Sequence, residues 1–295
     1  MGSRRMKVRM KDGRLSRPKR NLKEITVNQL SNLTILIFAI FWILPIAWLL
    51  ITSIQIREER FQIPPKWIPS SVEFSAYKRA WDLFPIAEQF LNSLKVATLS
   101  TLGALIISSL AAYAFARLNF FGREPLFLVI LAGMMIPPQL TVIPSFIAFR
   151  KIGLIDNHAA LFLPAMISPL GIFLLRQFFR SIPRELDESA KIDGAGPFRI
   201  FFQIILPLSK PAISALAVVL FIASWNDFFW PNIFISTSEK MTLPVGIASL
   251  VGVSGNTNVL LVMASVGMQI LPLLVIFLFT QRFLIQSIAT TGIRG

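Results

Sequence analysis

The sequence lacks cysteine entirely and contains a single histidine, His158, among its 295 residues. The absence of cysteine excludes disulfide scaffolds, thiolate metal sites and cysteine nucleophiles, and it leaves the redox compartment open. With one imidazole, zinc sites built on several histidines and most histidine-based triads are excluded as well. His158 lies in a short polar turn, and we assign it no ligand role.

Two further absences exclude classes of protein. The sequence has no Gly-x-x-x-x-Gly-Lys-Ser/Thr loop, so the chain is not its own P-loop ATPase. Its apolar runs are nearly free of acids, bases and metal ligands, which argues against an enzyme embedded in the membrane. They also lack the midplane charges and related halves of a secondary solute transporter, which stays the alternative hypothesis.

Charge is scarce at 15% of residues, whereas hydrophobic residues make up 54% and the mean hydropathy is +0.66. Because the hydrocarbon core of a bilayer is about 30 Å thick, a spanning helix needs roughly 20 mostly apolar residues. Six runs meet this requirement: residues 33–53, 96–116, 125–149, 159–175, 208–229 and 259–280. Pro137, Pro138 and Pro144 predict a kink or break in the third run. The sequence therefore predicts an all-α integral membrane protein with six transmembrane helices.

The formal net charge of +14 would suggest nucleic acid in a soluble protein, but most of it is local. Between Met1 and Glu24 lie ten Lys or Arg residues against one Asp and one Glu. This tail is a topology signal or a contact with anionic lipid headgroups, and we expect no nucleic-acid partner. The positive-inside rule places the N-terminus in the cytoplasm, and six spans return the C-terminus there.

No cleavage site for a signal peptide follows the first apolar run, which predicts a retained helix. The predicted organisation is therefore a basic cytoplasmic tail, residues 1–30, and one transmembrane domain, residues 31–295.

The longest predicted cytoplasmic connection, residues 181–207, is here called the elbow. Ser181 and Pro183 offer a helix start, and the acidic residues that follow suit the positive end of a helix dipole. Gly194, Gly196 and Pro197 then break this helix. An apolar stripe at helical spacing continues beyond the break: Phe198, Phe201, Phe202 and Ile205. The pattern predicts a helix–turn–helix between spans 4 and 5, which a soluble partner could grip to move a membrane helix.

The ordered motifs of the elbow resemble the cytoplasmic motif of permeases in binding-protein-dependent, ATP-driven importers. They read Glu188-Ser189-Ala190, Asp193-Gly194-Ala195 and Ile204-Ile205-Leu206-Pro207, with Ser189 where the family has Ala. Four other segments resemble the shorter permease of maltose-type sugar importers: Ala112 to Arg117, Pro207 to Pro211, Trp225 to Phe228 and Thr291 to Gly295. The resemblance covers most of the chain apart from the basic tail.

This resemblance implies the type I fold of an ABC importer permease in the bacterial inner membrane. The family's partners would be a second homologous permease, an ATPase dimer, an extracytoplasmic solute-binding protein and membrane lipid. No cofactor is expected in this chain, because ATP and Mg would bind the partner ATPase. The implied ATPase-coupling residues are Glu188, Ser189, Ala190, Asp193, Gly194, Ala195, Phe198, Leu206 and Pro207, and the C-terminal Thr291 to Gly295 would lie near the ATPase. The implied contacts with the binding protein are Gly252, Ser254, Gly255 and Asn256.

Several features of the sequence have two interpretations that stay open. By composition alone the acidic elbow reads as a solvated connection between helices. The Gly252 loop is also compatible with a plain periplasmic connection. Gln139, Asn226 and Gln269 within the spans either line a translocation path or join helices by hydrogen bonds. The resemblance favours an oligosaccharide, and the residues themselves do not distinguish maltodextrin, trehalose, a fragment of an acidic sugar polymer and glycerol phosphate.

Overall fold

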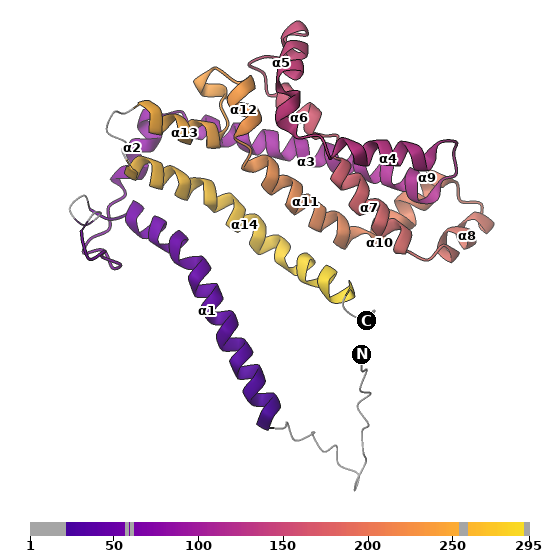
Figure 1. Ribbon diagram of the computed structural model, residues 1–295, viewed down its shortest axis with the longest axis horizontal. Helices are drawn as coiled ribbons and strands as arrows, with labels where there is room; N and C mark the ends of the chain where they lie inside the picture. The colour runs from indigo at the N-terminus through magenta and orange to yellow at the C-terminus, as the bar shows by residue number, and fades with distance from the viewer. Residues whose placement is uncertain (1–21, 57–58, 60–61, 254–258, 292–295) are drawn as a thin grey trace. The chain divides into compact units, whose positions relative to one another are not determined.

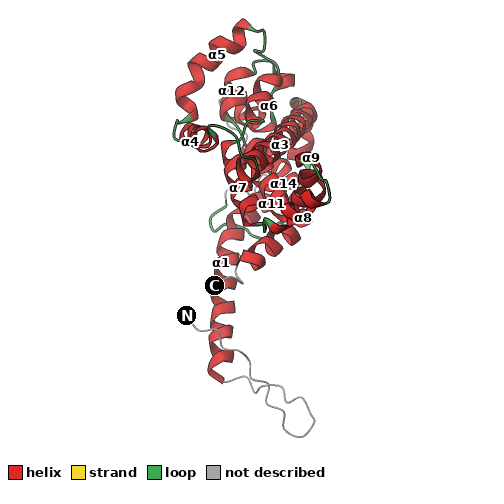
Figure 2. Cartoon of the chain, turned by 90° about the vertical axis from the view of Figure 1, so that its right-hand side faces the viewer, coloured by secondary structure: helices red, strands yellow, loops and turns green. Residues whose placement is uncertain are grey.

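The computed structural model of the chain describes residues 22–56, 59, 62–253 and 259–291. Throughout this described part, the only regular elements are helices (Figure 2). They are α1 (Leu22–Ser53), α2 (Ser75–Leu83), α3 (Ile86–Arg117), α4 (Arg123–Gly133), η1 (Pro138–Thr141), α5 (Val142–Lys151), α6 (Ala159–Ala165), α7 (Pro169–Ser181), α8 (Glu185–Ile192), α9 (Pro197–Ile200), η2 (Phe201–Ile205), α10 (Leu206–Leu208), α11 (Lys210–Trp225), α12 (Phe229–Phe234), η3 (Ser238–Lys240), α13 (Leu243–Val253) and α14 (Val259–Thr291). The chain divides into two compact units, Met1–Ile51 and Thr52–Gly295.

Four helical segments are long and apolar enough to cross a membrane: Gln29–Ser53, Ile86–Arg117, Ala159–Ser181 and Lys210–Phe234. Each overlaps a span that the sequence predicts. The predicted third span is a bent pair, Arg123–Gly133 and Pro138–Lys151, with 90° between its arms. Pro137 and Pro138 lie at this bend, which confirms the predicted break, whereas Pro144 lies inside α5. The apolar segment Leu260–Ile276 of α14 corresponds to the sixth run, and the count of six spans stays a prediction.

The described part of the unit Met1–Ile51 consists of most of α1. Every described side chain from Gln29 to Ile46 is exposed, although this part of the helix is strongly apolar. A helix that is hydrophobic all round needs an apolar solvent on all sides, and the hydrocarbon of a bilayer provides one. This helix therefore fits contact with lipid.

The second unit is organised around α3, which lies beside α7, α11 and α6 (Figure 1). Small side chains on its buried face allow this close approach, including Ala97, Ala104 and Ser108. The same principle operates on α7, where a Cβ added at Gly171 would lie 2.6 Å from the Ser108 hydroxyl oxygen. Without that Cβ the two helices pack at short range.

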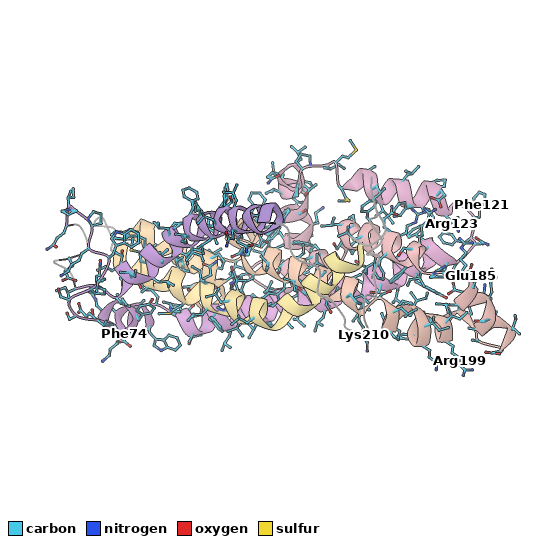
Figure 3. The ribbon with its side chains drawn as sticks, turned by 90° about the horizontal axis from the view of Figure 1, so that it is seen from below. Phe74, Phe121, Arg123, Glu185, Arg199 and Lys210 are labelled. Carbon is cyan, nitrogen blue, oxygen red and sulfur yellow. The ribbon has the colours of Figure 1, made fainter. Side chains whose placement is uncertain are left out.

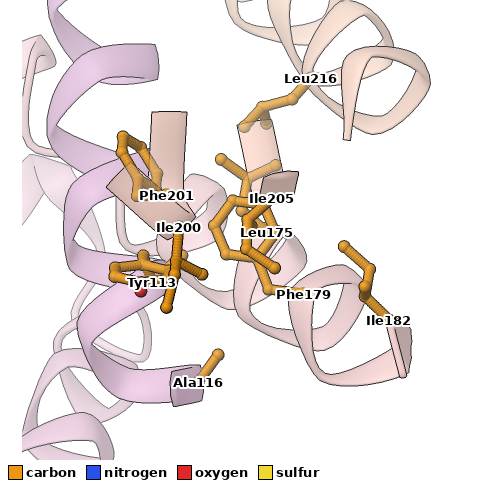
Figure 4. Close-up of a cluster of buried hydrophobic side chains, with 10 residues drawn as sticks. Tyr113, Ala116, Leu175, Phe179, Ile182, Ile200, Phe201, Ile205 and Leu216 are labelled. Carbon is orange, nitrogen blue, oxygen red and sulfur yellow. The ribbon is translucent and has the colours of Figure 1, made fainter. Parts of the chain in front are cut away.

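A buried cluster joins α3 to the elbow (Figure 4). It draws on α3, α7, the elbow and α11: Ala112, Tyr113, Ala116, Leu175, Phe179, Ile182, Ile200, Phe201, Ile205 and Leu216. Phe179 and Ile205 are completely buried, and the rings of Tyr113 and Phe201 lie 5.1 Å apart between centroids. Burying such large apolar side chains stabilises each by roughly 1.5–3 kcal/mol, so this cluster fixes the elbow against the membrane helices.

Candidate functional site

The elbow forms two short helices, α8 and α9, separated by a turn. Gly194 adopts the left-handed conformation with φ of 80°, and its N–H donates to Lys191 O. The next amide, Ala195 N, donates to Ala190 O at 2.9 Å. These two bonds form a Schellman motif, which favours glycine at the left-handed position. The backbone at these residues therefore follows the order helix, turn, helix, and the role of the segment as a coupling elbow stays a prediction.

The structure corrects the predicted start of the first elbow helix. Ser181 is the last residue of α7, where its hydroxyl donates to Phe178 O. The helix α8 begins at Glu185 after Arg184, because Pro183 favours an extended residue before it and interrupts the helix. The acidic first turn of α8 agrees with the expectation from the helix dipole.

The predicted apolar stripe is also corrected, because it does not form one buried face. Phe201 and Ile205 are buried, whereas Phe198 is 74% exposed and Phe202 is 56% exposed. Residues Phe201–Ile205 form a turn of π-helix, which changes the spacing from that of an α-helix. Ile200, which the stripe omitted, is buried in place of Phe198.

The coupling residues implied by the resemblance divide into two groups. Six are exposed at the surface of the elbow: Glu188, Ser189, Asp193, Gly194, Phe198 and Pro207. Ala190, Ala195 and Leu206 are partly buried and pack against the cluster of Figure 4. Two apolar side chains that the sequence analysis missed join the exposed set, since Leu186 is 40% and Ile192 is 87% exposed. Because these two residues are isolated apolar residues in an acidic helix, the periodicity of the sequence did not identify them.

A buried ion pair ties the elbow to the C-terminal end of α3, here called the elbow end. Arg117 Nε lies 3.4 Å from Asp187 Oδ2, and both side chains are almost fully buried. The guanidinium also donates from Nη2 to Ile182 O at 2.7 Å. One turn earlier on α3, the Tyr113 hydroxyl donates to Pro197 O at 3.0 Å. The sequence analysis counted Asp187 among acids suited to the helix dipole, and it did not identify this partner.

A second buried arginine braces the same end of the bundle. Arg176 Nη2, on α7, lies 2.8 Å from both carboxylate oxygens of Glu124. Its guanidinium carbon lies 3.9 Å from the centre of the Phe127 ring, and its Nε donates to Phe115 O. Arginine suits such a site because its planar group forms hydrogen bonds and stacks on a ring together. Figure 3 shows Arg123, Glu185 and Arg199 at this end and Phe74 at the other.

Polar contacts also hold the N-terminal end of α3, here called the loop end, to residues 235–243. Asn92 donates to Glu239 O and Met241 O, and the Ser93 hydroxyl accepts from Leu243 N. The loop is held again by Asp156, whose carboxylate accepts from Ser236 N, from Thr237 N and Oγ1, and from Lys240 Nζ. His158, to which no role was assigned, lies 2.7 Å from Lys240 O through Nε2.

The polar residues predicted within the spans join helices more than they line a path. Gln269 donates to Asn226 Oδ1 at 3.3 Å, and Trp225 Nε1 donates to Gln269 O. Asn226 and Gln269 therefore form the interhelical link that was one of their two interpretations, and Gln139 is exposed on η1. Of the predicted contacts with a binding protein, Gly252 lies in the last turn of α13. Ser254, Gly255 and Asn256, like residues 1–21 and 292–295, lie outside the described residues.

A cavity of about 500 Å³ opens beside the middle of α3. Its walls come from α3, η1, α5, α6, α11 and α12: Val96, Ser100, Thr101, Ala104, Pro138, Thr141, Ser145, Phe149, Ala160, Leu161, Pro164, Ala165, Ile167, Leu220, Ala223, Ser224, Asp227, Trp230, Pro231 and Phe234. The volume lies within the range of roughly 300–1,000 Å³ that is usual for ligand pockets. None of Gln139, Asn226 and Gln269 lines it, so the sequence analysis missed this polar surface.

Comparison with known proteins gives one family. The model of the "binding-protein-dependent transport system inner membrane component" matches residues 103–290. The arabinooligosaccharides transport system permease protein AraQ of Bacillus subtilis is 38% identical over 206 residues, covering 70% of this chain and 73% of the relative. The melibiose/raffinose/stachyose import permease protein MelC of the same organism is 33% identical over 256 residues, covering 85% and 91%.

Other similar proteins are named for different substrates. The sn-glycerol-3-phosphate transport system permease protein UgpE of Pectobacterium atrosepticum is 34% identical over 239 residues, covering 79% of this chain and 85% of the relative. A solved structure of a bacterial ABC transporter involved in the import of the acidic polysaccharide alginate superposes with a TM-score of 0.79 at 24% identity. It covers 91% of this chain and 100% of that chain, and it shows a shared fold.

Proposed function

Because the chain belongs to the family of binding-protein-dependent transport system inner membrane components, we propose how it works as the permease subunit of an ATP-driven sugar importer. The subunit forms half of the translocation pathway and carries no catalytic role of its own. Membership of this family disfavours the secondary solute transporter. The substrate is an oligosaccharide, in line with two of the relatives, whose names specify arabinooligosaccharides and raffinose-type sugars.

The working complex contains three other components. A second homologous permease completes the pathway, a solute-binding protein delivers the sugar, and an ATPase dimer holds ATP and Mg. The family name specifies an inner membrane component that depends on a binding protein, which supports this assembly. The elbow faces the cytoplasm together with both termini, as the basic tail indicates. The loop that contains Gly252, Ser254, Gly255 and Asn256 faces the binding protein.

The observation that carries the coupling proposal is the division of the elbow into an exposed face and a buried anchor. Glu188, Asp193 and the apolar Ile192 are available to a partner. Asp187 on the same helix is buried against Arg117 of α3. Breaking a buried pair by removing one partner costs about 3–5 kcal/mol, so the anchor resists separation from α3. A force on the exposed face is therefore passed to a membrane-spanning helix.

Substitution of Gly194 by asparagine tests the docking face. Apart from the two adjacent residues, no atom of the described chain lies within 4 Å of a Cβ added at Gly194, so the new side chain fits here but occupies space that the ATPase needs. Asparagine tolerates the left-handed conformation better than most residues, so the change tests docking more than backbone strain. Gly153→Asn is a matched control, since Gly153 also has positive φ and open space but lies far from the elbow.

The measurement is capture of the chain from membranes in mild detergent, with mass spectrometry of the copurified proteins and uptake assayed in parallel. We expect the wild type and Gly153→Asn to retain a P-loop ATPase and a second permease. With Gly194→Asn, the amount of copurified ATPase should fall at least tenfold. A wild-type chain recovered alone would overturn the importer itself. Full ATPase recovery with Gly194→Asn would overturn only the docking assignment.

A further inference from the structure

The cavity beside α3 has a mostly apolar lining that includes several polar side chains, and it lies between segments that are apolar enough to span a membrane. Its hydroxyl-bearing side chains come from several elements: Ser100 and Thr101 on α3, Thr141 on η1, Ser145 on α5 and Ser224 on α11. Polar groups inside a membrane are costly and mark functional positions or pathways when they face a cavity. Five hydroxyl-bearing residues therefore line one cavity, and of these the Thr141 hydroxyl already donates to Pro138 O at 2.8 Å.

Two of these hydroxyls lack an internal partner. Ser100 is 3% exposed and Thr101 is 6% exposed, and neither side-chain oxygen has a hydrogen bond within the described residues. A buried hydroxyl without a partner costs about 1–3 kcal/mol, so a structure keeps it where a ligand or water completes it. Both residues line the cavity, but the two oxygens themselves are covered, so a side-chain rotation is needed before a ligand in that space can complete them.

The only ionisable side chain in the lining is Asp227. Its Oδ1 accepts from the amides of Phe229 at 3.0 Å and Trp230 at 3.5 Å, in the first turn of α12, and no ion pair of Asp227 is found among the described residues. A carboxylate accepts hydrogen bonds from neighbouring hydroxyl groups of a ligand, and it repels a phosphate or a second carboxylate. The absence of Lys and Arg from the lining leaves nothing to compensate an anionic ligand.

Aromatic rings complete the cavity. Trp230 and Phe234 stack with 1° between their planes and 5.5 Å between their centroids, and Phe149 packs edge-on to Phe234 at 5.2 Å. These contacts hold the ring of Trp230 in one orientation. Flat apolar faces match the C–H faces of a pyranose or furanose, whereas the hydroxyls and the carboxylate match its rim.

We propose that this cavity is a subsite for one neutral sugar unit and that it selects against anionic substrates. The inference rests on the proposed importer function and adds a direct contact between this subunit and its substrate. Among the substrates that the relatives' names specify, it favours arabino- and raffinose-type oligosaccharides over glycerol phosphate and alginate.

The test uses the complete importer in proteoliposomes with its binding protein and ATP. The neutral probes are raffinose, stachyose and arabinotriose, and the anionic probes are sn-glycerol-3-phosphate and an alginate trisaccharide. Thr101→Val removes one cavity hydroxyl without changing the side-chain shape. Thr242→Val is the matched control, because Thr242 is also buried with an unpartnered hydroxyl but does not line the cavity. Asp227→Asn removes the charge and keeps an oxygen for the Phe229 amide.

We expect the best-transported probe to be neutral and the anionic probes to enter at less than a tenth of its rate. Thr101→Val should slow uptake of that probe about threefold to tenfold, which is the usual range for one hydrogen bond. Asp227→Asn should slow uptake of the neutral probe tenfold or more and lower the ratio of neutral to anionic uptake. Thr242→Val should leave uptake unchanged, and the ATPase activity without substrate should stay constant in all variants.

Three results would overturn the subsite while leaving the importer intact. These are preferred uptake of an anionic probe, equal uptake by Thr101→Val and Thr242→Val, and an unchanged anion preference in Asp227→Asn. ATP-dependent uptake of none of the probes by the wild type, together with no copurified ATPase, would instead overturn the importer function and the subsite with it.

Discussion

The two ends of α3 are both fastened to a neighbouring segment, but by different chemistry. At the elbow end the fastening is a buried ion pair, Arg117 with Asp187, above a large apolar cluster. At the loop end neutral side chains such as Asn92 bind backbone groups of residues 239–243, and the ion pair of Asp156 with Lys240 is partly exposed. Buried pairs are lost at high cost, whereas exposed pairs contribute roughly 0–1 kcal/mol.

The difference indicates which end is fixed and which end is adjustable. A segment that transmits force must not separate from its helix, and the elbow end meets this requirement. The loop end buries Ile235 and Leu243 as well, but its charged contact is partly exposed, so that contact is broken at lower cost than the pair at the elbow end. The cavity contacts α3 between these ends, through Ser100 and Thr101. The single helix α3 therefore connects the proposed docking face, the proposed subsite and the loop end.

Removal of Asp187 should break this comparison most severely. Asp187→Ala leaves the Arg117 guanidinium buried without its carboxylate, which costs about 3–5 kcal/mol. We expect a large drop in the unfolding temperature of the purified complex and loss of uptake. Glu185→Ala, which removes an exposed acid from the same helix, should change neither. Equal behaviour of the two variants would show that the buried pair does not anchor the elbow.

A double substitution tests whether the charges of the Arg117–Asp187 pair are needed. Arg117→Met with Asp187→Leu replaces the pair by apolar side chains, and such replacements of buried pairs are often neutral for stability. We expect the double variant to recover most of the unfolding temperature lost by Asp187→Ala. Recovery of uptake as well would show that a firm contact suffices, and loss of uptake with stability restored would assign transmission to the charges.

The hydroxyl of Tyr113 makes a smaller contribution to the elbow end. Tyr113→Phe removes the hydrogen bond to Pro197 O and keeps the ring contact with Phe201, so we expect a loss of about 0.5–1.5 kcal/mol. Hydrogen exchange of residues 195–201 should become several-fold faster. Tyr77→Phe removes a comparable bond to the Ser53 hydroxyl and should leave exchange in the elbow unchanged. Slower or equal exchange after Tyr113→Phe would contradict this assignment.

Much of the fold could be predicted because it depends on local composition. Apolar runs of sufficient length give the spans, and Pro137 with Pro138 gives the 90° bend. The turn at Gly194 was also predictable, since a glycine after a short helix is a local signal. The apolar stripe failed because it assumed the α-helical period through Phe201–Ile205, where tertiary packing favours a π-turn.

The parts of the site that escaped prediction are the ones that distant segments make together. Arg117 and Asp187 each look like ordinary surface charges in their own segments, and only the packing of α3 against the elbow buries both. The cavity presents the same difficulty, because single serines and threonines in apolar helices are common. Its meaning depends on six elements that converge on one space, and the periodicity of the sequence carries no information about that convergence.

Acidification offers the mildest test of the comparison, because protonation of Asp156 should loosen the loop end. The hydrogen bond from Lys240, with those from Thr237, holds the pKa of Asp156 well below its usual value of 3.8. A carboxyl whose pKa is depressed in the folded state contributes stability above its unfolded pKa and loses it as the pH falls below that value. Hydrogen exchange of residues 235–242, corrected for intrinsic rates, should therefore stay constant from about pH 8 to 5 and rise below about pH 4.

Asp156→Asn should show the faster exchange already at neutral pH. Glu239→Gln is the control and should behave as wild type, because Glu239 contacts Asn92 through its backbone carbonyl, which the substitution keeps. If Asp156→Asn instead also speeds exchange in the elbow, the two ends are not independently fastened, and α3 connects them more tightly than their separate contacts imply.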